Sequence, residues 1–160
     1  MQLDAIDRSI LRTLQVEGRI ANSELARRAE ISAPAMHERV KKLESAGVIE
    51  RYVALVDPSS VGIGSHFYVE ATLSPHTKDA VAEFIAAARG MDEIMECHHV
   101  TGDADFLLKI AVRDITAYEN IILHGLTELP HVDSLKTMVV LSTFKQETAY
   151  SIEEIDHDPA

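Results

Sequence analysis

Apolar residues recur at helical spacing in the first third of the chain. One apolar stripe lies between Asp4, a residue suited to an N-cap, and Gly18, where we expect the helix to end. Its members are Ile6, Ile10, Leu11 and Leu14. A short second helix is predicted to start at Asn22 or Ser23, and a third spans about residues 34–46, with Ser32 as its N-cap.

The segment after the third predicted helix changes character at Gly47, a typical helix-ending residue. Residues 48–49 and 52–56 are rich in apolar and β-branched side chains, so we expect them to fold back as a short strand pair, a wing. Two short helices, a tight turn and a third helix are typical of a helix-turn-helix. Residues 1–57 are therefore predicted to form a winged helix-turn-helix domain.

Farther along the chain, several stretches alternate apolar and polar residues with the period of β-strands. Strands are predicted at residues 66–73, 94–101, 105–112 and 135–144. One helix is expected after Pro75, and another after the Thr-x-x-Glu capping box of Thr116. The order strand-helix-strand-strand-helix-strand predicts a ferredoxin-like βαββαβ sandwich, so the chain as a whole is α+β.

Turn-forming residues separate the two patterns. Residues 57–60 read Asp-Pro-Ser-Ser, and Gly62 and Gly64 follow. We therefore expect a linker at residues 58–64, the ferredoxin-like domain at 65–145 and an acidic C-terminal tail at 146–160.

One face of the predicted sheet lacks a helical cover. Its expected side chains are Tyr68, Met95, Cys97, His99, Leu107, Met138 and Val140. The tail is one alternative cover, but it ends in acidic residues and offers little apolar surface. Packing of this face against the sheet of a second copy is the favoured interpretation.

Charge is distributed unevenly along the chain. The net charge is -11, yet residues 1–52 hold nine Lys/Arg and eight Asp/Glu, whereas the remainder holds six and eighteen. A locally basic module on an acidic body is compatible with DNA binding, and it predicts steep salt dependence. No apolar run of membrane-spanning length and no signal-like N-terminal segment occur, and Cys97 is the single cysteine, so we expect a cytoplasmic protein.

The exposed side of the third predicted helix carries the candidate DNA contacts. His37 and Glu38 are placed to reach base edges, since a Glu carboxylate can accept from the cytosine amino group, and the nearby cations suit phosphates. The expected DNA-binding residues are Ser32, Pro34, His37, Glu38, Arg39, Lys41, Lys42 and Arg51. The alternative is an ordinary amphipathic helix with a solvated charged face. The three-helix context favours DNA binding.

A second candidate site is the turn at residues 101–105. Asp103 and Asp105 stand two residues apart beside Gly102, which lets backbone amides approach a ligand. A carboxylate here suits an α-ammonium group, but Gly and Asp are also routine in solvated turns.

Cys97, His98 and His99 do not complete a zinc-binding set, so no metal and no cofactor are expected. No catalytic motif is evident, so an enzyme is not expected.

These residues resemble the Lrp/AsnC family of feast/famine regulators over essentially the full length. The resemblance rests on residues 3–11, on Glu38-Arg39-Val40 with Leu43-Glu44-x-x-Gly47-Val48-Ile49, and on the stretch from Glu96 to Leu108 that contains Gly-Asp-x-Asp-Phe. It implies a dimer that pairs through its sheets and assembles into tetramers or octamers. It also implies an effector site at Thr101, Gly102, Asp103 and Asp105, with Met138 and Val140 as further members. His37, His99 and Phe106 depart from common family residues, which leaves base preference and effector choice open.

The leading hypothesis is a sequence-specific regulator that binds double-stranded promoter DNA and responds to a small effector, an amino acid such as leucine, methionine or a branched-chain relative. Two alternatives stay open from the sequence. One is an enzyme on the same scaffold, for example a tetrapyrrole decarboxylase that uses histidines. The other is an architectural DNA-bridging protein without an effector.

Overall fold

The computed structural model describes residues 2–153, and these form two compact units. The first unit contains the chain up to Leu55 together with the stretch that begins at Lys145, and the second is Val56–Phe144. The glutamate and aspartates expected in the tail after residue 153 lie outside the described residues. No helix in the described part of the chain is both long enough and apolar enough to cross a membrane.

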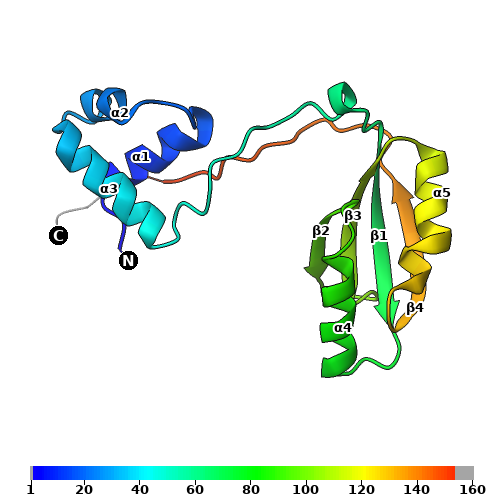
Figure 1. Cartoon of the computed structure of the whole chain (residues 1–160). Coiled ribbons are helices and arrows are strands. Elements are labelled where there is room, and N and C mark those ends of the chain that lie inside the picture. Colours follow the sequence, from blue (N-terminus) through cyan, green and yellow to red (C-terminus); the bar gives the residue numbers. More distant parts are fainter. Residues whose placement is uncertain (1, 154–160) are drawn as a thin grey trace. The chain divides into compact units, whose positions relative to one another are not determined.

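Helices α1 (Ala5–Val16), α2 (Asn22–Arg28) and α3 (Ala33–Ser45) form the core of the first unit (Figure 1). The predicted N-caps are confirmed: the Asp4 side chain accepts a hydrogen bond from the Asp7 backbone N–H, and Ser32 accepts from Ala35. Seven apolar residues meet between the three helices. They are Ile10, Leu11, Leu25, Ala26, Met36, Val40 and Leu43.

The expected wing strands are not formed within the described chain. Residues 48–49 are a bend after α3, and residues 51–56 are extended with exposed side chains and no paired strand. Val53 and Leu55 are exposed. High β-propensity alone does not produce a ladder, because a strand needs a hydrogen-bonded neighbour.

The C-terminal stretch packs on the helices of the first unit. The Gln15 side-chain amide donates to the Tyr150 carbonyl oxygen at 3.1 Å, and its oxygen accepts from the Tyr150 N–H at 2.7 Å. Ile152 packs against the core of the three helices, and the Arg8 guanidinium donates to the Glu153 carbonyl at 3.4 Å. These contacts make residues 150–153 part of the first unit's packing.

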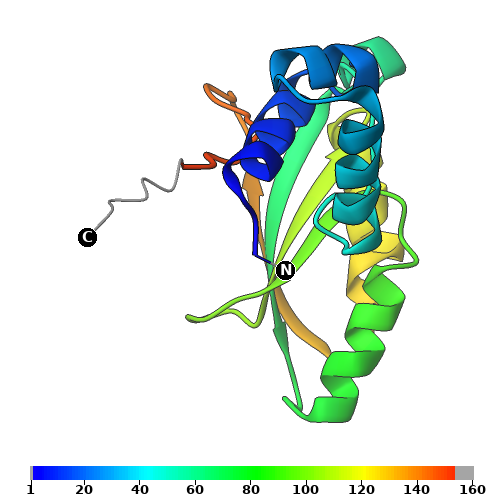
Figure 2. The ribbon, with the colours of Figure 1, turned by 90° about the vertical axis from the view of Figure 1, so that its left-hand side faces the viewer.

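The second unit has the predicted βαββαβ order. Its elements are β1 (Ser65–Leu73), α4 (Lys78–Ala88), β2 (Ile94–His99), β3 (Phe106–Val112), α5 (Ile115–His124) and β4 (Val132–Val139), with short 3₁₀ helices at Ser59–Val61 and Leu126–Glu128. The strands form one antiparallel sheet in the order β2-β3-β1-β4. Figure 2 shows α4 and α5 on the same side of this sheet.

The core of the second unit lies between the sheet and its two helices. Alternate residues of β1 and β3 are buried there, as the period of two requires. Phe84 of α4 packs on Phe106, and Tyr118 of α5 stacks on Phe67 with ring centroids 3.7 Å apart. The other sheet face, which we call the open face, carries no helix.

Three details differ from the sequence predictions. Helix α5 is capped by Asp114, whose side chain accepts from the Ala117 N–H at 2.8 Å, rather than by Thr116. Strand β4 runs from Val132 to Val139 instead of residues 135–144, since its pairing with β1 ends at Phe67. Residues 100–105 form a loop between β2 and β3 rather than a tight hairpin turn.

Strand β2 also shows a face different from the expected one. Its pairing with β3 shifts at Met95, where Ile94 is opposite Ile110 but Glu96 is opposite Lys109. A bulge of one residue exchanges the faces of everything that follows. Cys97 and His99 therefore lie on the helix-covered face, and Glu96 and His98 lie on the open face.

Candidate functional site

The third helix presents two faces of different chemistry. Met36, Val40 and Leu43 are buried against the other helices. Of the expected DNA-binding residues, the exposed ones on and next to α3 are Ser32, Pro34, His37, Glu38, Lys41 and Lys42. The structure thus places this set together on the solvent side of one helix, as 100° rotation per residue requires.

Two lysines of α3 are available to a partner. Lys41 and Lys42 take part in none of the ion pairs found among residues 2–153, whereas Arg27 and Arg28 of α2 are both paired with Glu24. Arg28 also contacts Glu17 at 2.6 Å. The Asn22 amide nitrogen lies 3.4 Å from Nδ1 of His37, so His37 stands where α2 meets α3. Arg51 is exposed in the extended segment that follows.

Arg39 has a different environment from the other candidates. One guanidinium nitrogen, Nη1, donates to Asp4 at 2.7 Å and to Asp7 at 2.8 Å. Hydrogen bonds to these carboxylates raise the pKa of Arg39, and the Asp7 backbone N–H together with Arg39 lowers the pKa of Asp4. Arg39 therefore ties α3 to the start of α1, and we assign it to the fold rather than to phosphate contacts.

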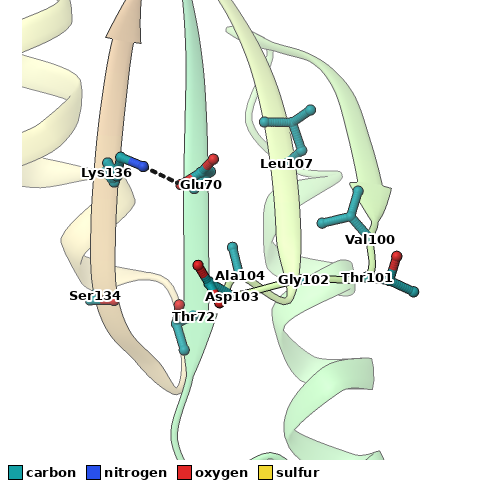
Figure 3. Close-up of a pocket in the computed structure, with 10 residues that line it drawn as sticks. All are labelled: Glu70, Thr72, Val100, Thr101, Gly102, Asp103, Ala104, Leu107, Ser134 and Lys136. Carbon is teal, nitrogen blue, oxygen red and sulfur yellow. Dashed lines mark ion pairs between the residues drawn. The ribbon is translucent and has the colours of Figure 1, made fainter.

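The second unit contains a pocket of about 610 Å³ on the open face of the sheet (Figure 3). It lies where the loop between β2 and β3 approaches β1 and β4. The lining residues are Glu70, Thr72, Val100, Thr101, Gly102, Asp103, Ala104, Leu107, Ser134 and Lys136. A volume of this size is within the range of small-molecule sites.

Three of the six expected effector residues line this pocket. Thr101, Gly102 and Asp103 form its loop side, and Gly102 has a φ of 129°, which favours glycine there. Met138 and Val140 do not line it. Met138 lies opposite Tyr68 farther along the sheet, and the Val140 N–H donates to the His66 carbonyl at 3.0 Å.

Asp105 also lies outside the pocket lining and holds the loop in place. One carboxylate oxygen accepts from the Leu73 backbone N–H at 2.8 Å, and the other lies 2.9 Å from Nδ1 of His76. The Leu73 hydrogen bond, with His76, lowers the pKa of Asp105. Its backbone N–H also donates to the Ala71 carbonyl at 3.1 Å. The two aspartates of the turn therefore have separate roles.

Sequence reasoning missed the pocket residues that strands supply. Glu70 and Thr72 of β1 stand opposite Lys136 and Ser134 of β4, and Glu70 also stands opposite Leu107 of β3. The Lys136 ammonium lies 3.1 Å from the Glu70 carboxylate. Alternation along β1 places Glu70 and Thr72 on the open face, but only the strand pairing shows which residues face them.

The cysteine and histidines of β2 form no metal site. No group of three or more potential ligands is arranged to hold an ion within residues 2–153. Burial raises the pKa of the Cys97 thiol, which packs against the core of the sheet. The His99 ring lies over Phe106, with centroids 5.0 Å apart.

The two sites correspond to two known domain families. A model of winged helix-turn-helix DNA-binding domains matches residues 3–50, and a model of the Lrp/AsnC ligand binding domain matches residues 66–150. The leucine-responsive regulatory proteins of Salmonella typhimurium and Escherichia coli K12 are each 42% identical to this chain over 144 residues, which is 90% of this chain and 88% of theirs.

Solved structures show the same architecture. A transcriptional regulator of Neisseria meningitidis in complex with L-Met has a TM-score of 0.88 and 33% identity, covering 94% of this chain and 97% of that chain. Escherichia coli AsnC has a TM-score of 0.85 and 26% identity, covering 92% and 98%. These relatives are regulators, which overturns the alternative of a decarboxylase on this scaffold. The chain belongs to the Lrp/AsnC family and is a DNA-binding transcriptional regulator with a ligand-binding domain.

Proposed function

We propose that this regulator binds a free amino acid in the open-face pocket and changes its binding to promoter DNA in response. The observation that carries the proposal is the pocket itself, which combines charged, hydroxyl and aliphatic side chains beside the Thr101–Asp103 part of the loop. Relatives named as leucine-responsive, and a similar structure in complex with L-Met, support leucine, methionine or a branched-chain relative as the effector.

For DNA, we propose that α3 enters the major groove with its exposed side. His37 and Glu38 are the candidates for base contacts, and Ser32, Lys41, Lys42 and Arg51 for phosphates, with Pro34 at the start of the helix against the backbone. The Ser32 hydroxyl oxygen accepts the capping hydrogen bond from the Ala35 N–H, and its proton can still be donated to a phosphate oxygen.

We further propose that the chain acts as a dimer that assembles into tetramers or octamers. The open face exposes Tyr68 and Met138 opposite each other, and Leu107, next to Glu70, is half-buried on the same face. The extended segments add exposed Leu141 and Phe144. Apolar area of this kind in water favours burial against a second copy.

The DNA part of the proposal is tested by removing both lysine charges of α3. A Lys41→Ala, Lys42→Ala variant is expected to bind a fragment with the gene's own upstream region more weakly, and the slope of log affinity against log salt falls by about 1 for each phosphate that is no longer neutralised. Lys78→Ala with Arg89→Ala is the control, since both residues are exposed in the second unit. Equal affinities and slopes for wild type and the α3 variant would contradict the proposal.

The effector part is tested by thermal unfolding against the twenty amino acids. A ligand at 100 times its dissociation constant stabilises the folded protein by about 2.7 kcal/mol. We expect leucine or methionine to raise the unfolding temperature and to change DNA affinity. If no amino acid does either, while DNA still binds, the protein is an effector-independent DNA-bridging protein.

A further inference from the structure

We infer that the Glu70–Lys136 ion pair recognises the backbone of the amino-acid effector, with Glu70 binding the α-ammonium group and Lys136 binding the α-carboxylate. This inference rests on the proposed function, because it assigns roles within the same pocket. It departs from the sequence-based expectation, in which Asp103 or Asp105 binds the ammonium group and loop amides bind the carboxylate.

The first support is the position of the two charges. Glu70 and Lys136 are direct partners across β1 and β4, their charged groups lie 3.1 Å apart, and both side chains line the pocket. In Figure 3 they point toward each other along one wall. A free amino acid carries an ammonium and a carboxylate on one carbon, so it can face an adjacent acid and base at the same time.

The second support is that this pair is easy to open. The Glu70 side chain is 32% exposed and the Lys136 side chain 74% exposed. An ion pair in such a setting contributes little to stability, because water screens it and two long side chains must be held in one geometry. A zwitterion that enters between them gives each charge a new opposite charge, so the loss is compensated.

The third support is the opposite wall of the pocket. Leu107 of β3 stands next to Glu70 on the side away from Lys136, and Val100 lies beyond it toward β2 (Figure 3). A ligand whose charged end meets Glu70 and Lys136 directs its side chain toward this aliphatic wall. The lining contains two carboxylates, Glu70 and Asp103, and one ammonium group, Lys136, so its net charge is negative. This charge disfavours ligands with an acidic side chain. The class selected is a neutral, aliphatic amino acid.

The sheet contains a matched control pair. The Lys109 ammonium lies 2.7 Å from the Glu96 carboxylate, also across neighbouring strands and on the open face. Neither residue lines the pocket. Glu96 additionally contacts His98 at 3.0 Å. A Lys109→Met variant therefore removes the same type of charge from the same face without touching the proposed site.

The experiment compares L-leucine with two analogues by titration calorimetry of the full-length protein. 3-Methylbutylamine lacks the carboxylate of leucine, and 4-methylpentanoate lacks its ammonium group. Wild type is expected to bind leucine at least about tenfold more tightly than either analogue, as charge-assisted contacts imply. Lys136→Met is expected to lose the preference for leucine over 3-methylbutylamine, because the carboxylate no longer has a partner. Glu70→Gln is expected to lose the preference for leucine over 4-methylpentanoate, because the ammonium group no longer has a charged partner. Lys109→Met keeps both preferences.

Ratios of affinities within one variant do not depend on how much of that variant is folded, so partial unfolding cannot imitate the result. The inference is overturned if both pocket variants keep the wild-type ratios, or if Asp103→Asn abolishes the preference over the acid and Glu70→Gln does not. In those outcomes leucine still binds wild type and the proposed function stands. If wild type binds none of the twenty amino acids, the proposed function itself fails.

Discussion

At the scale of single residues, neighbouring side chains of one type have different roles. Asp103 is exposed on the loop and lines the pocket, whereas Asp105 bonds the Leu73 N–H and contacts His76. Lys42 and Arg39 differ in the same way on α3, because only Arg39 reaches the carboxylates of α1. The residue types are alike, and the contacts decide the role.

Asp105→Asn is expected to destabilise the second unit at neutral pH by about 1 kcal/mol, since a charged acceptor is replaced by a neutral one. The folded-state pKa of Asp105 lies below the ordinary value of 3.8, so its charge contributes stability above that pH. The contribution is lost as the pH falls through the lower, folded-state pKa. Urea unfolding at several pH values should show the difference from wild type shrinking below about pH 4. Asp103→Asn serves as the control, because Asp103 does not contact Leu73 or His76. If the stability difference between wild type and Asp105→Asn persisted in acid, the proposed role of the Asp105 charge would be refuted.

Arg39→Ala is expected to lower the stability of the first unit by about 1–3 kcal/mol, because Asp7, whose side chain is only 7% exposed, loses its cation. Lys42→Ala should leave stability nearly unchanged and weaken DNA binding instead. Denaturant unfolding and DNA titration of the same two variants measure both effects. If Arg39→Ala kept full stability and lost DNA binding, Arg39 would be a phosphate contact, as the sequence predicted.

At the scale of elements, the C-terminal stretch is the least expected part of the fold. The Gln15 side chain holds it at Tyr150, because the amide both donates to and accepts from the Tyr150 backbone. The same stretch follows β4, which supplies Ser134 and Lys136 to the pocket wall. One continuous segment therefore contributes to the ligand pocket and then to the packing of the helix-turn-helix.

Gln15→Ala is expected to release this stretch. The Tyr150 N–H loses its acceptor, so its hydrogen exchange should accelerate by about fivefold, the factor that corresponds to a typical net hydrogen-bond contribution of about 1 kcal/mol. Exchange measured by NMR or mass spectrometry tests this. Gln146→Ala changes an exposed glutamine of the same stretch and should leave the rate as in wild type. An unchanged rate at Tyr150 in Gln15→Ala would show that the docking does not persist in solution.

At the scale of the whole molecule, the open face of the sheet is the feature that requires explanation. Tyr68 and Met138 stand opposite each other and remain 36% and 38% exposed. Because neither of these two side chains lines the pocket, pairing of two copies through this part of the face would bury apolar area away from the ligand site.

Met138→Asp is therefore expected to shift the protein toward smaller assemblies, since burying a carboxylate in an apolar interface is costly. Sedimentation velocity over a range of concentrations measures the shift. Ala86→Asp, on the exposed side of α4, introduces the same charge away from the open face and should leave the distribution unchanged. If both variants sediment like wild type, the open face is not the interface.

Features that local chemistry controls could be predicted from the amino-acid pattern. The helices of the first unit, their caps at Asp4 and Ser32, and the βαββαβ order follow from periodicity and capping, in which each residue acts on neighbours three or four positions away. The exposed set on α3 follows from the same geometry. The loop residues Thr101, Gly102 and Asp103 stood out because Gly and Asp have distinctive local roles.

The other features depend on pairing between distant segments, so they become visible only in the folded chain. A single bulge at Met95 set the face of Cys97, and antiparallel register brought Glu70 to Lys136, 66 positions later. Asp105 and Arg39 took structural roles because partners from β1 and α1, Leu73 and Asp7, reached them. No local sequence pattern predicts these long-range contacts, because they are determined by the burial of the two cores and by the hydrogen bonds of the sheet as a whole.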